Sequence, residues 1–195
     1  MEEVVQTRNA YESEAEAYVE KYCSISAVDI YGDTFLEVLA DGQSDEPSRL
    51  LDLGCGPGSD IETFNAAGYE VVGLDITQSF LRKATGNALV ADFVCGDMRN
   101  LPFSGESFEG IWASASLHHI PRSDIKATLR DCQRILRSGG SLCASVKHDV
   151  QPEDDTERHF EYYTVEEFQS VLNNTGFDVR TAETRGGWTV VIATC

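Results

Sequence analysis

The chain has 195 residues and a formal charge of −18 at pH 7, because 33 aspartates and glutamates outnumber 15 lysines and arginines. This length predicts one domain, residues 1–195, that buries its own core, and no apolar run approaches the roughly 18 residues of a membrane span. The acidic composition argues against nucleic acid as a partner, because phosphate contacts depend on lysine and arginine, and it suits a salt-rich cytoplasm and therefore a halophilic source.

Two helices are expected before the first strand. A Glu-rich helix is predicted over Arg8–Tyr22, with Tyr11 and Tyr18 two turns apart. Apolar residues at helical spacing predict a second helix over Ala27–Leu39, followed by a polar linker that ends at Pro47.

A strand that runs into a glycine turn is the most informative segment. Residues Leu50–Leu53 precede Gly54, Gly56 and Gly58, and a helix is expected from about Asp60. Glycine reaches positive φ and lets the backbone approach a small ligand, while the helix N-terminus adds a partial positive charge. The spacing G-x-G-x-G differs from the G-x-G-x-x-G of dinucleotide-binding proteins, so a nicotinamide cofactor is not expected.

The next two strands end beside acidic residues. The strand Glu70–Asp75 ends about 20 residues after the glycine turn, where doubly wound nucleotide sites keep a carboxylate for the ribose hydroxyls. A third strand, near Leu89–Cys95, leads into Gly96-Asp97-Met98. Acidic residues around one site suit a cationic, hydroxylated ligand and suit a pyrophosphate poorly; these residues are Asp52, Asp75 and Asp97.

The second half of the chain continues the alternation of strands and helices. A fourth strand is expected over Phe108–Ala113 and a fifth over Ser141–Val146. Between them lies a helix whose apolar stripe runs from Ile125 to Leu136, capped by Ser123 or Asp124 and ended by Gly139.

The last segments predict how the sheet closes. An acidic loop is expected over residues 148–158, and Thr164 is expected to cap a helix over Val165–Asn174. Phe177–Glu183 and Trp188–Thr194 predict an antiparallel pair. The whole pattern predicts an α/β fold: a doubly wound, Rossmann-like, mostly parallel sheet of about seven strands, with an antiparallel last strand and helices on both faces.

Taken in order, the motifs of residues 9–147 resemble the class I S-adenosylmethionine-dependent methyltransferases, in particular the small-molecule type similar to methyltransferase domains 11 and 25. Glu109 departs from the family, which more often has aspartate there. The motifs that carry the resemblance are Asp52 with its glycine turn, Asp75, Gly96-Asp97-Met98, Leu117-His118-His119-Ile120-Pro121 and Leu136-Arg137-Ser138-Gly139-Gly140.

The resemblance implies S-adenosyl-L-methionine as cofactor and S-adenosyl-L-homocysteine as product. It also implies that residues 1–45 form cap helices over a Rossmann-like core of residues 48–195. The cofactor-binding residues implied in this way are Tyr18, Asp52, Gly54, Cys55, Gly56, Gly58, Asp75, Ile76, Asp97, Met98 and Ser114.

The acceptor is expected to be a small molecule, methylated by in-line displacement. The residues predicted to line its pocket are Tyr11, His119, His148 and Tyr162. His118 and His119 are candidates for a general base, because a histidine near neutrality can take a proton from a hydroxyl or an amine. The alternative, which we favour, is that one ring packs under its loop and the other lies at the surface.

The sequence is also compatible with two other classes of function. The alternatives are an RNA methyltransferase and a cofactor-binding protein without turnover that serves a partner subunit. A monomer or a homodimer is expected. No metal site is expected, because the six cysteines lack C-x-x-C spacing or paired histidines. A cytoplasmic location is expected, because such cysteines suit a reducing compartment and the start Met1-Glu2-Glu3 lacks the basic residues of a signal peptide.

Overall fold

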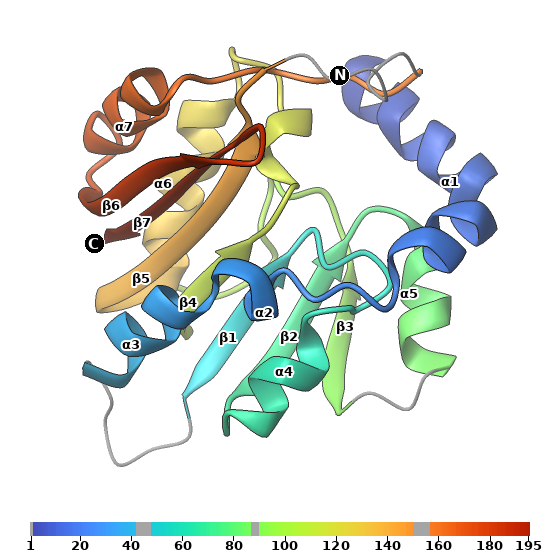
Figure 1. Ribbon diagram of the computed structural model, residues 1–195, viewed down its shortest axis with the longest axis horizontal. Coiled ribbons are helices and arrows are strands. Elements are labelled where there is room, and N and C mark those ends of the chain that lie inside the picture. The colour runs from blue at the N-terminus through green and yellow to red at the C-terminus, as the bar shows by residue number, and fades with distance from the viewer. Residues whose placement is uncertain (1, 42–47, 87–89, 150–156) are drawn as a thin grey trace.

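The computed structural model describes residues 2–41, 48–86, 90–149 and 157–195. These residues form one seven-stranded sheet in the order β3-β2-β1-β4-β5-β7-β6 (Figure 1). The strands are β1 (Arg49–Leu53), β2 (Glu70–Asp75), β3 (Ala91–Cys95), β4 (Phe108–Ala113), β5 (Leu136–Lys147), β6 (Asp178–Arg185) and β7 (Trp188–Thr194). Strands β1 to β5 pair in parallel, and β7 is antiparallel to both of its neighbours. The predicted fold class is confirmed.

Helices cover both faces of the sheet, with α3 and α4 in front of it and α6 behind it in Figure 1. The helices are α1 (Glu2–Tyr22), α2 (Val28–Tyr31), α3 (Asp33–Asp41), α4 (Ile61–Ala66), α5 (Gln78–Gly86), the 3-10 turn η1 (Leu117–His119), α6 (Ile125–Ile135) and α7 (Val165–Asn173). Alternation along a strand sends successive side chains to opposite faces. In β1, Leu51 therefore packs with α6 and α7, while Leu50 packs with α3, α4 and Trp112.

Several predicted elements are confirmed by the structure. Strands β2, β4 and β7 have the predicted bounds, and β6 begins one residue later than predicted. Thr164 caps α7 through a capping box, in which its side chain accepts from the Glu167 backbone and the Glu167 side chain accepts from the Thr164 backbone.

The N-terminal helices differ from the prediction. Helix α1 begins at Glu2, six residues before Arg8. The helix predicted over Ala27–Leu39 is wrong, because the chain forms two helices that break at Gly32. A Cβ on Gly32 would lie 2.6 Å from the Val28 side chain, so only glycine permits this close turn.

The end of α6 also differs. Gly139 does not end this helix; the chain leaves α6 at Ile135, and Gly139 lies inside β5 with a φ of +79°. Its N–H donates to the Cys195 backbone at 3.0 Å, where the register of β4 against β5 shifts. Asp124 lies at the N-cap of α6 without capping it, because its carboxylate binds Arg99 at 3.1 Å. In the acidic loop predicted over 148–158, Pro152-Glu153-Asp154-Asp155 lies outside the described residues.

Candidate functional site

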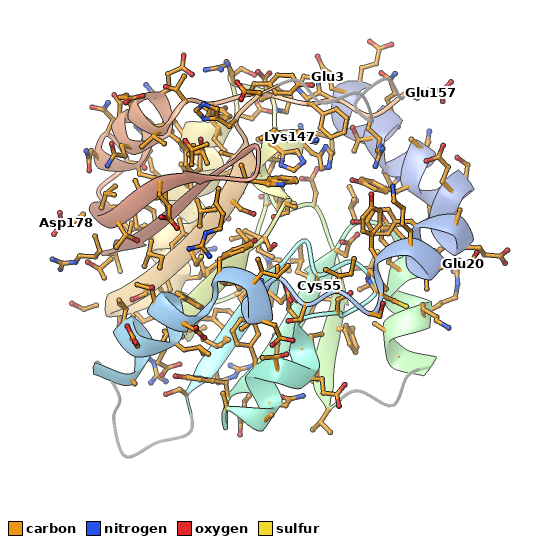
Figure 2. The ribbon with its side chains drawn as sticks, in the orientation of Figure 1. Glu3, Glu20, Cys55, Lys147, Glu157 and Asp178 are labelled. Carbon is orange, nitrogen blue, oxygen red and sulfur yellow. The ribbon has the colours of Figure 1, made fainter. Side chains whose placement is uncertain are left out.

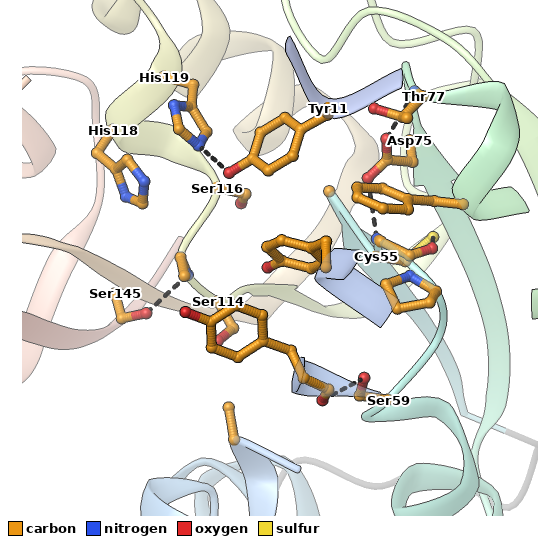
Figure 3. A pocket seen from close by; sticks show the side chains of 18 of the residues that line it. Tyr11, Cys55, Ser59, Asp75, Thr77, Ser114, Ser116, His118, His119 and Ser145 are labelled. Atoms are coloured by element: carbon orange, nitrogen blue, oxygen red, sulfur yellow. Dashed lines mark hydrogen bonds between the residues drawn. The ribbon is translucent and has the colours of Figure 1, made fainter. Parts of the chain in front are cut away.

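A cavity of about 660 Å³ lies at the carboxyl ends of the parallel strands, beneath α1 (Figure 3). Small-molecule sites typically measure about 300–1,000 Å³, and doubly wound folds bind ligands at this edge. Cys55 and Lys147 lie towards the middle of the molecule, whereas Glu20 and Asp178 lie at its periphery (Figure 2). In Figure 3, Asp75 and Cys55 line one side of the cavity and His118 and His119 line the other. We call these the glycine-turn side and the histidine side.

The glycine turn forms the first wall. Gly54, Gly56 and Gly58 have φ values of +80°, +53° and +85°, the left-handed region that favours glycine. A Cβ on Gly54 would lie 2.5 Å from Cβ of Ser116, whereas a Cβ on Gly56 would meet nothing within 4 Å. Gly54 is therefore required for packing, and Gly56 faces open space in the cavity.

Asp75 is held in place by the backbone around it. Its carboxylate accepts from the Gly56 N–H at 2.9 Å and from the Thr77 N–H at 2.7 Å. Burial raises the pKa of Asp75 above its ordinary value, although these hydrogen bonds act in the opposite direction. The carboxylate therefore links the end of β2 to the glycine turn, and it borders the cavity.

Asp52 is buried with one of its carboxyl oxygens unsatisfied within the described part of the chain. Its Oδ2 has no hydrogen-bond partner among the described residues. Burial raises the pKa of Asp52 well above the ordinary range, and the nearby carboxyls of Asp60 and Asp75 add smaller contributions in the same direction. A buried acid without a partner is destabilising unless a ligand meets it.

Asp97 differs from the other two acids. Arg99 donates from Nε to both carboxylate oxygens of Asp97 at 3.1 Å. Burial acts to raise the pKa of Asp97, but the hydrogen bonds from Arg99 outweigh it and the pKa is lowered. Asp97 is therefore ionised, and it borders the cavity while bound to arginine.

Two acidic residues that the sequence analysis missed hold the surrounding helices. Asp60 accepts from the Ala27 N–H at 2.7 Å and from Trp112 Nε1 at 2.7 Å, so it ties α2 to the core and does not cap α4. Glu12 of α1 accepts from the Gln78 N–H at 2.6 Å and thereby caps α5. No local pattern reveals these bonds, because their partners lie 33 to 66 positions away.

Aromatic rings of α1 cover the glycine-turn side. Tyr18 lies 5.0 Å from Phe80 of α5 and 4.7 Å from Tyr22, measured between ring centroids. Tyr11 lies 5.6 Å from Phe80. These rings form an aromatic wall on the glycine-turn side of the cavity.

His118 is buried and His119 is half-buried in the cavity wall, so neither residue is exposed at the surface, contrary to the expectation for one of the two rings. Nδ1 of His119 lies 2.7 Å from the backbone oxygen of His159. Because that oxygen only accepts, Nδ1 carries the proton and Nε2 accepts from the Tyr11 hydroxyl at 2.9 Å. Burial lowers the pKa of His119 to about 4, and it lowers that of His118 well below the ordinary value, so both rings are neutral at pH 7.

Most of the predicted site residues line this cavity. For the cofactor they are Tyr18, Asp52, Gly54, Cys55, Gly56, Asp75, Ile76, Asp97, Met98 and Ser114, and for the acceptor they are Tyr11 and His119. Gly58 is not in the wall, although Pro57 and Ser59 on either side of it are. The hydroxyl of Ser114 is bonded to that of Tyr31. Burial raises the pKa of the Cys55 thiol well above its ordinary value, so this cysteine is a poor nucleophile.

Two predicted acceptor residues lie outside the cavity wall. His148 follows the end of β5, and its Nδ1 lies 2.9 Å from Oγ1 of Thr189. Lys147, the residue before it, takes the position in the cavity, because successive side chains of a strand alternate. The Tyr162 backbone accepts from Arg122, and the cavity is lined instead by Phe160.

Two features are absent from the described residues. These residues contain no group of three or more histidine, cysteine, aspartate or glutamate side chains able to hold a metal ion. Within the same ranges, no helix is both long enough and apolar enough to cross a membrane.

Sequence comparison identifies relatives with a stated chemistry. The profile of the family described as "Methyltransferase domain" matches residues 50–140. The 27-O-demethylrifamycin SV methyltransferase of Amycolatopsis mediterranei (strain S699) is 33% identical over 72% of this chain and 60% of that protein. The malonyl-[acyl-carrier protein] O-methyltransferase of Pseudescherichia vulneris is 31% identical over 49% of this chain and 38% of that protein. The chain thus spans about two- to three-fifths of these relatives' length.

Comparison with solved structures supports the fold. The complex between the Haloferax volcanii Trm112 methyltransferase activator and a methyltransferase contains a chain with a TM-score of 0.76, 16% identity and 96% coverage of both chains. The 1,6-didemethyltoxoflavin-N1-methyltransferase of Burkholderia thailandensis, solved with 1,6-didemethyltoxoflavin and S-adenosylhomocysteine, gives a TM-score of 0.67 at 19% identity, covering 95% of this chain and 87% of that one. The family profile and the sequence relatives, on the fold that these solved structures support, identify residues 50–140 as a domain of the class I S-adenosylmethionine-dependent methyltransferases.

Proposed function

We propose that this chain transfers a methyl group from S-adenosylmethionine to a small-molecule acceptor. The observation that carries the proposal is the meeting of Asp52, Asp75 and the open face of Gly56 at one side of a single cavity. A cationic ligand with hydroxyl groups matches this set, since carboxylates attract the cation and accept from hydroxyls. A diphosphate would be repelled by the same carboxylates.

The residues divide into roles by position. Asp75 is fixed by two backbone N–H groups and has lone pairs left to accept from vicinal hydroxyls. Asp52 offers an oxygen without a partner among the described residues, which a ligand ammonium would satisfy. The aromatic wall of Tyr18 and Phe80 would pack against the ligand's apolar parts. Helices α1 to α3 would act as the cap over the core from residue 48 onwards.

The protein's contribution to rate is alignment and the exclusion of water. The bound cofactor supplies a methyl group on a sulfonium, an excellent leaving group, so a strong base is not essential. Tyr11 and His119 close the cavity through their mutual hydrogen bond. His119 is neutral, but its lone pair already accepts from Tyr11, so its role would be to position the acceptor.

Calorimetry at high KCl tests the cofactor assignment. S-adenosylmethionine and S-adenosylhomocysteine are expected to bind, and NAD is expected not to bind. A screen of cofactor consumption across hydroxyl, amine, carboxylate and thiol acceptors then tests turnover. Binding of NAD without either adenosyl ligand would overturn the proposal and leave only the fold.

A second candidate function is supported by the Haloferax volcanii neighbour, whose solved complex contains a methyltransferase activator. According to this second candidate function, the chain needs a partner subunit for turnover. Repeating the screen with and without a purified Trm112-type activator separates the two, because only the second candidate predicts turnover that depends on the activator. An RNA substrate is disfavoured by the ion pairs in the basic run from Arg130 to Arg137, in which Arg134 binds Asp131 and Arg137 binds Glu109.

A further inference from the structure

Two basic residues line the histidine side of the cavity. Lys147 is the last residue of β5 and is 6% exposed. Arg158 borders the same cavity from the segment before α7. A lysine is rarely this buried unless its charge is paired, and Lys147 and Arg158 both interact with other groups of the chain.

Phe160 lies close to both of these cations. Lys147 Nζ is 5.3 Å from the centroid of the Phe160 ring and 5.1 Å from that of Trp188. Arg158 Cζ is 5.5 Å from the Phe160 ring and 5.1 Å from the Tyr11 ring. This side of the cavity therefore combines flat apolar walls with positive charge.

The histidines extend the flat wall. The His118 ring is stacked on Phe160 at 5.5 Å with an interplanar angle of 28°, and it lies 5.5 Å from Trp188. Burial, assisted by the positive charges of Lys147 and Arg158, lowers the pKa of both histidines and keeps them neutral. The positive charge on this side therefore comes from Lys147 and Arg158.

The opposite side of the cavity has the opposite charge. Asp75 lies beside Cys55 of the glycine turn, across the cavity from the histidines in Figure 3, and Asp52, two residues before that turn, lines the same cavity. A ligand spanning the cavity thus meets carboxylates at one end and cations at the other. The two ends select for different charges.

We propose that the methyl acceptor is a planar, largely apolar small molecule with an anionic group, which Lys147 and Arg158 bind while its ring packs against Phe160 and Trp188. This inference rests on the proposed function, because it assigns the cofactor to the glycine-turn side. Arg158 can pair with a carboxylate through two N–H groups, and Lys147 adds a point charge. The same cations repel amine acceptors that are protonated at neutral pH.

Matched pairs of acids and amides test the charge requirement. The protein is saturated with S-adenosylhomocysteine at high KCl and titrated with 4-hydroxybenzoate and 4-hydroxybenzamide, and with indole-3-carboxylate and indole-3-carboxamide. The two members of a pair have nearly the same shape and differ in charge. In at least one pair the acid is expected to bind about ten- to a hundredfold more tightly than the amide. Equal binding within both pairs, or no binding by either acid, overturns the inference.

Variants locate the charge that is responsible. K147M and R158M are each expected to remove most of the preference for the acid, and K147R is expected to retain it. The matched control is K126M, which removes a lysine charge from the exposed face of α6 outside the cavity and should leave the preference unchanged. A preference that survives in both K147M and R158M also overturns the inference.

Binding of S-adenosylhomocysteine in each variant separates this inference from the proposed function. Retained cofactor binding shows that the variant is folded and that a lost acid preference is local. Failure of the unaltered protein to bind S-adenosylhomocysteine contradicts the proposed function itself. Normal cofactor binding without any preference for acids contradicts only the assignment of the acceptor.

Discussion

The Tyr11 hydroxyl donates to Nε2 of His119, and the direction of this hydrogen bond is fixed by the backbone carbonyl of His159 on the other side of the ring. The one lone pair of the neutral imidazole is therefore already in use. Tyr11 comes from the cap helix and His119 from the turn after β4, so the pair joins two walls of the cavity. This geometry favours a positioning role for His119 over a role as general base.

Replacing the histidines tests that role. H119A and H118A are each expected to lower kcat by roughly tenfold or less, because in-line alignment and the sulfonium supply most of the rate. With saturating cofactor, the pH profile of kcat for the unaltered protein should be flat between about pH 5 and 7, since burial lowers the pKa of His119 to about 4. Y11F, which removes only the hydroxyl, should show a similarly small loss. A loss of about a hundredfold or more in H119A, together with the disappearance of an acidic limb from the pH–rate profile, would instead identify a general base.

The ribose assignment is tested at Asp75. D75N keeps one acceptor oxygen for the glycine turn but removes the charge, so we expect affinity for S-adenosylmethionine to fall by about 1 to 3 kcal/mol. Calorimetry measures this directly. D92N, on the exposed face of β3, is the control for a general change in charge. Unchanged affinity in D75N would mean that the hydroxyls bind elsewhere.

Asp52 is expected to lower stability in the absence of ligand. Its pKa is raised in the folded protein, so its contribution to stability is lost as pH rises above the unfolded value of about 3.9. D52N should therefore raise Tm at pH 7, by about 2–4 °C for each kcal/mol recovered, while weakening the cofactor. Calorimetric scans without ligand and titrations with it give the two results. A lower Tm in D52N would show that the carboxylate stabilises the fold.

The same residue predicts a pH dependence of binding. A cationic ligand favours the ionised form of Asp52, so binding should release protons and affinity should fall as pH decreases towards the raised pKa. Titrations in two buffers with different ionisation enthalpies measure the proton release. D52N should release fewer protons than the unaltered protein, and equal release would assign the protons to another group.

Alanine variants at two glycines with positive φ distinguish an effect on stability from an effect on ligand binding. Gly56 and Gly68 both have positive φ, and a Cβ on either would meet nothing within 4 Å. G56A and G68A should each cost about 1–2 kcal/mol of stability. Only Gly56 lines the cavity, so only G56A should weaken the binding of S-adenosylhomocysteine. If both variants bind normally, the space beside Gly56 is not part of the cofactor site.

Sequence reasoning succeeded where the signal is local. Apolar runs ending in glycine or aspartate predicted β1 and β2 and the turn between β1 and α4, because buried parallel strands have little freedom in composition. It failed at Gly32 and Gly139, where a glycine is needed for a close contact or a register shift that only the folded chain reveals.

The acceptor end of the site was harder to predict for a different reason. His148 lies outside the cavity wall whereas Lys147, one residue before it, lines the wall, because one residue reverses the face to which a strand side chain points. Phe160 and Trp188 enter the cavity from segments that are distant in sequence, and neither carries a motif. Charged and aromatic residues of this kind can be assigned only once the fold has brought them together.

Helix α1 is attached to both sides of the cavity that it covers. Thr7 Oγ1 accepts from the His159 N–H at 2.8 Å on the histidine side, and Glu12 accepts from the Gln78 N–H at 2.6 Å beside the glycine turn. The two residues are five positions apart, about 7.5 Å along one rigid helix, so a shift that breaks one contact strains the other. The glycine-turn side and the histidine side therefore share α1 as a wall. If binding of one ligand fixes α1 in place, the second ligand binds without the free-energy cost of ordering that helix, so the two ligands should bind cooperatively.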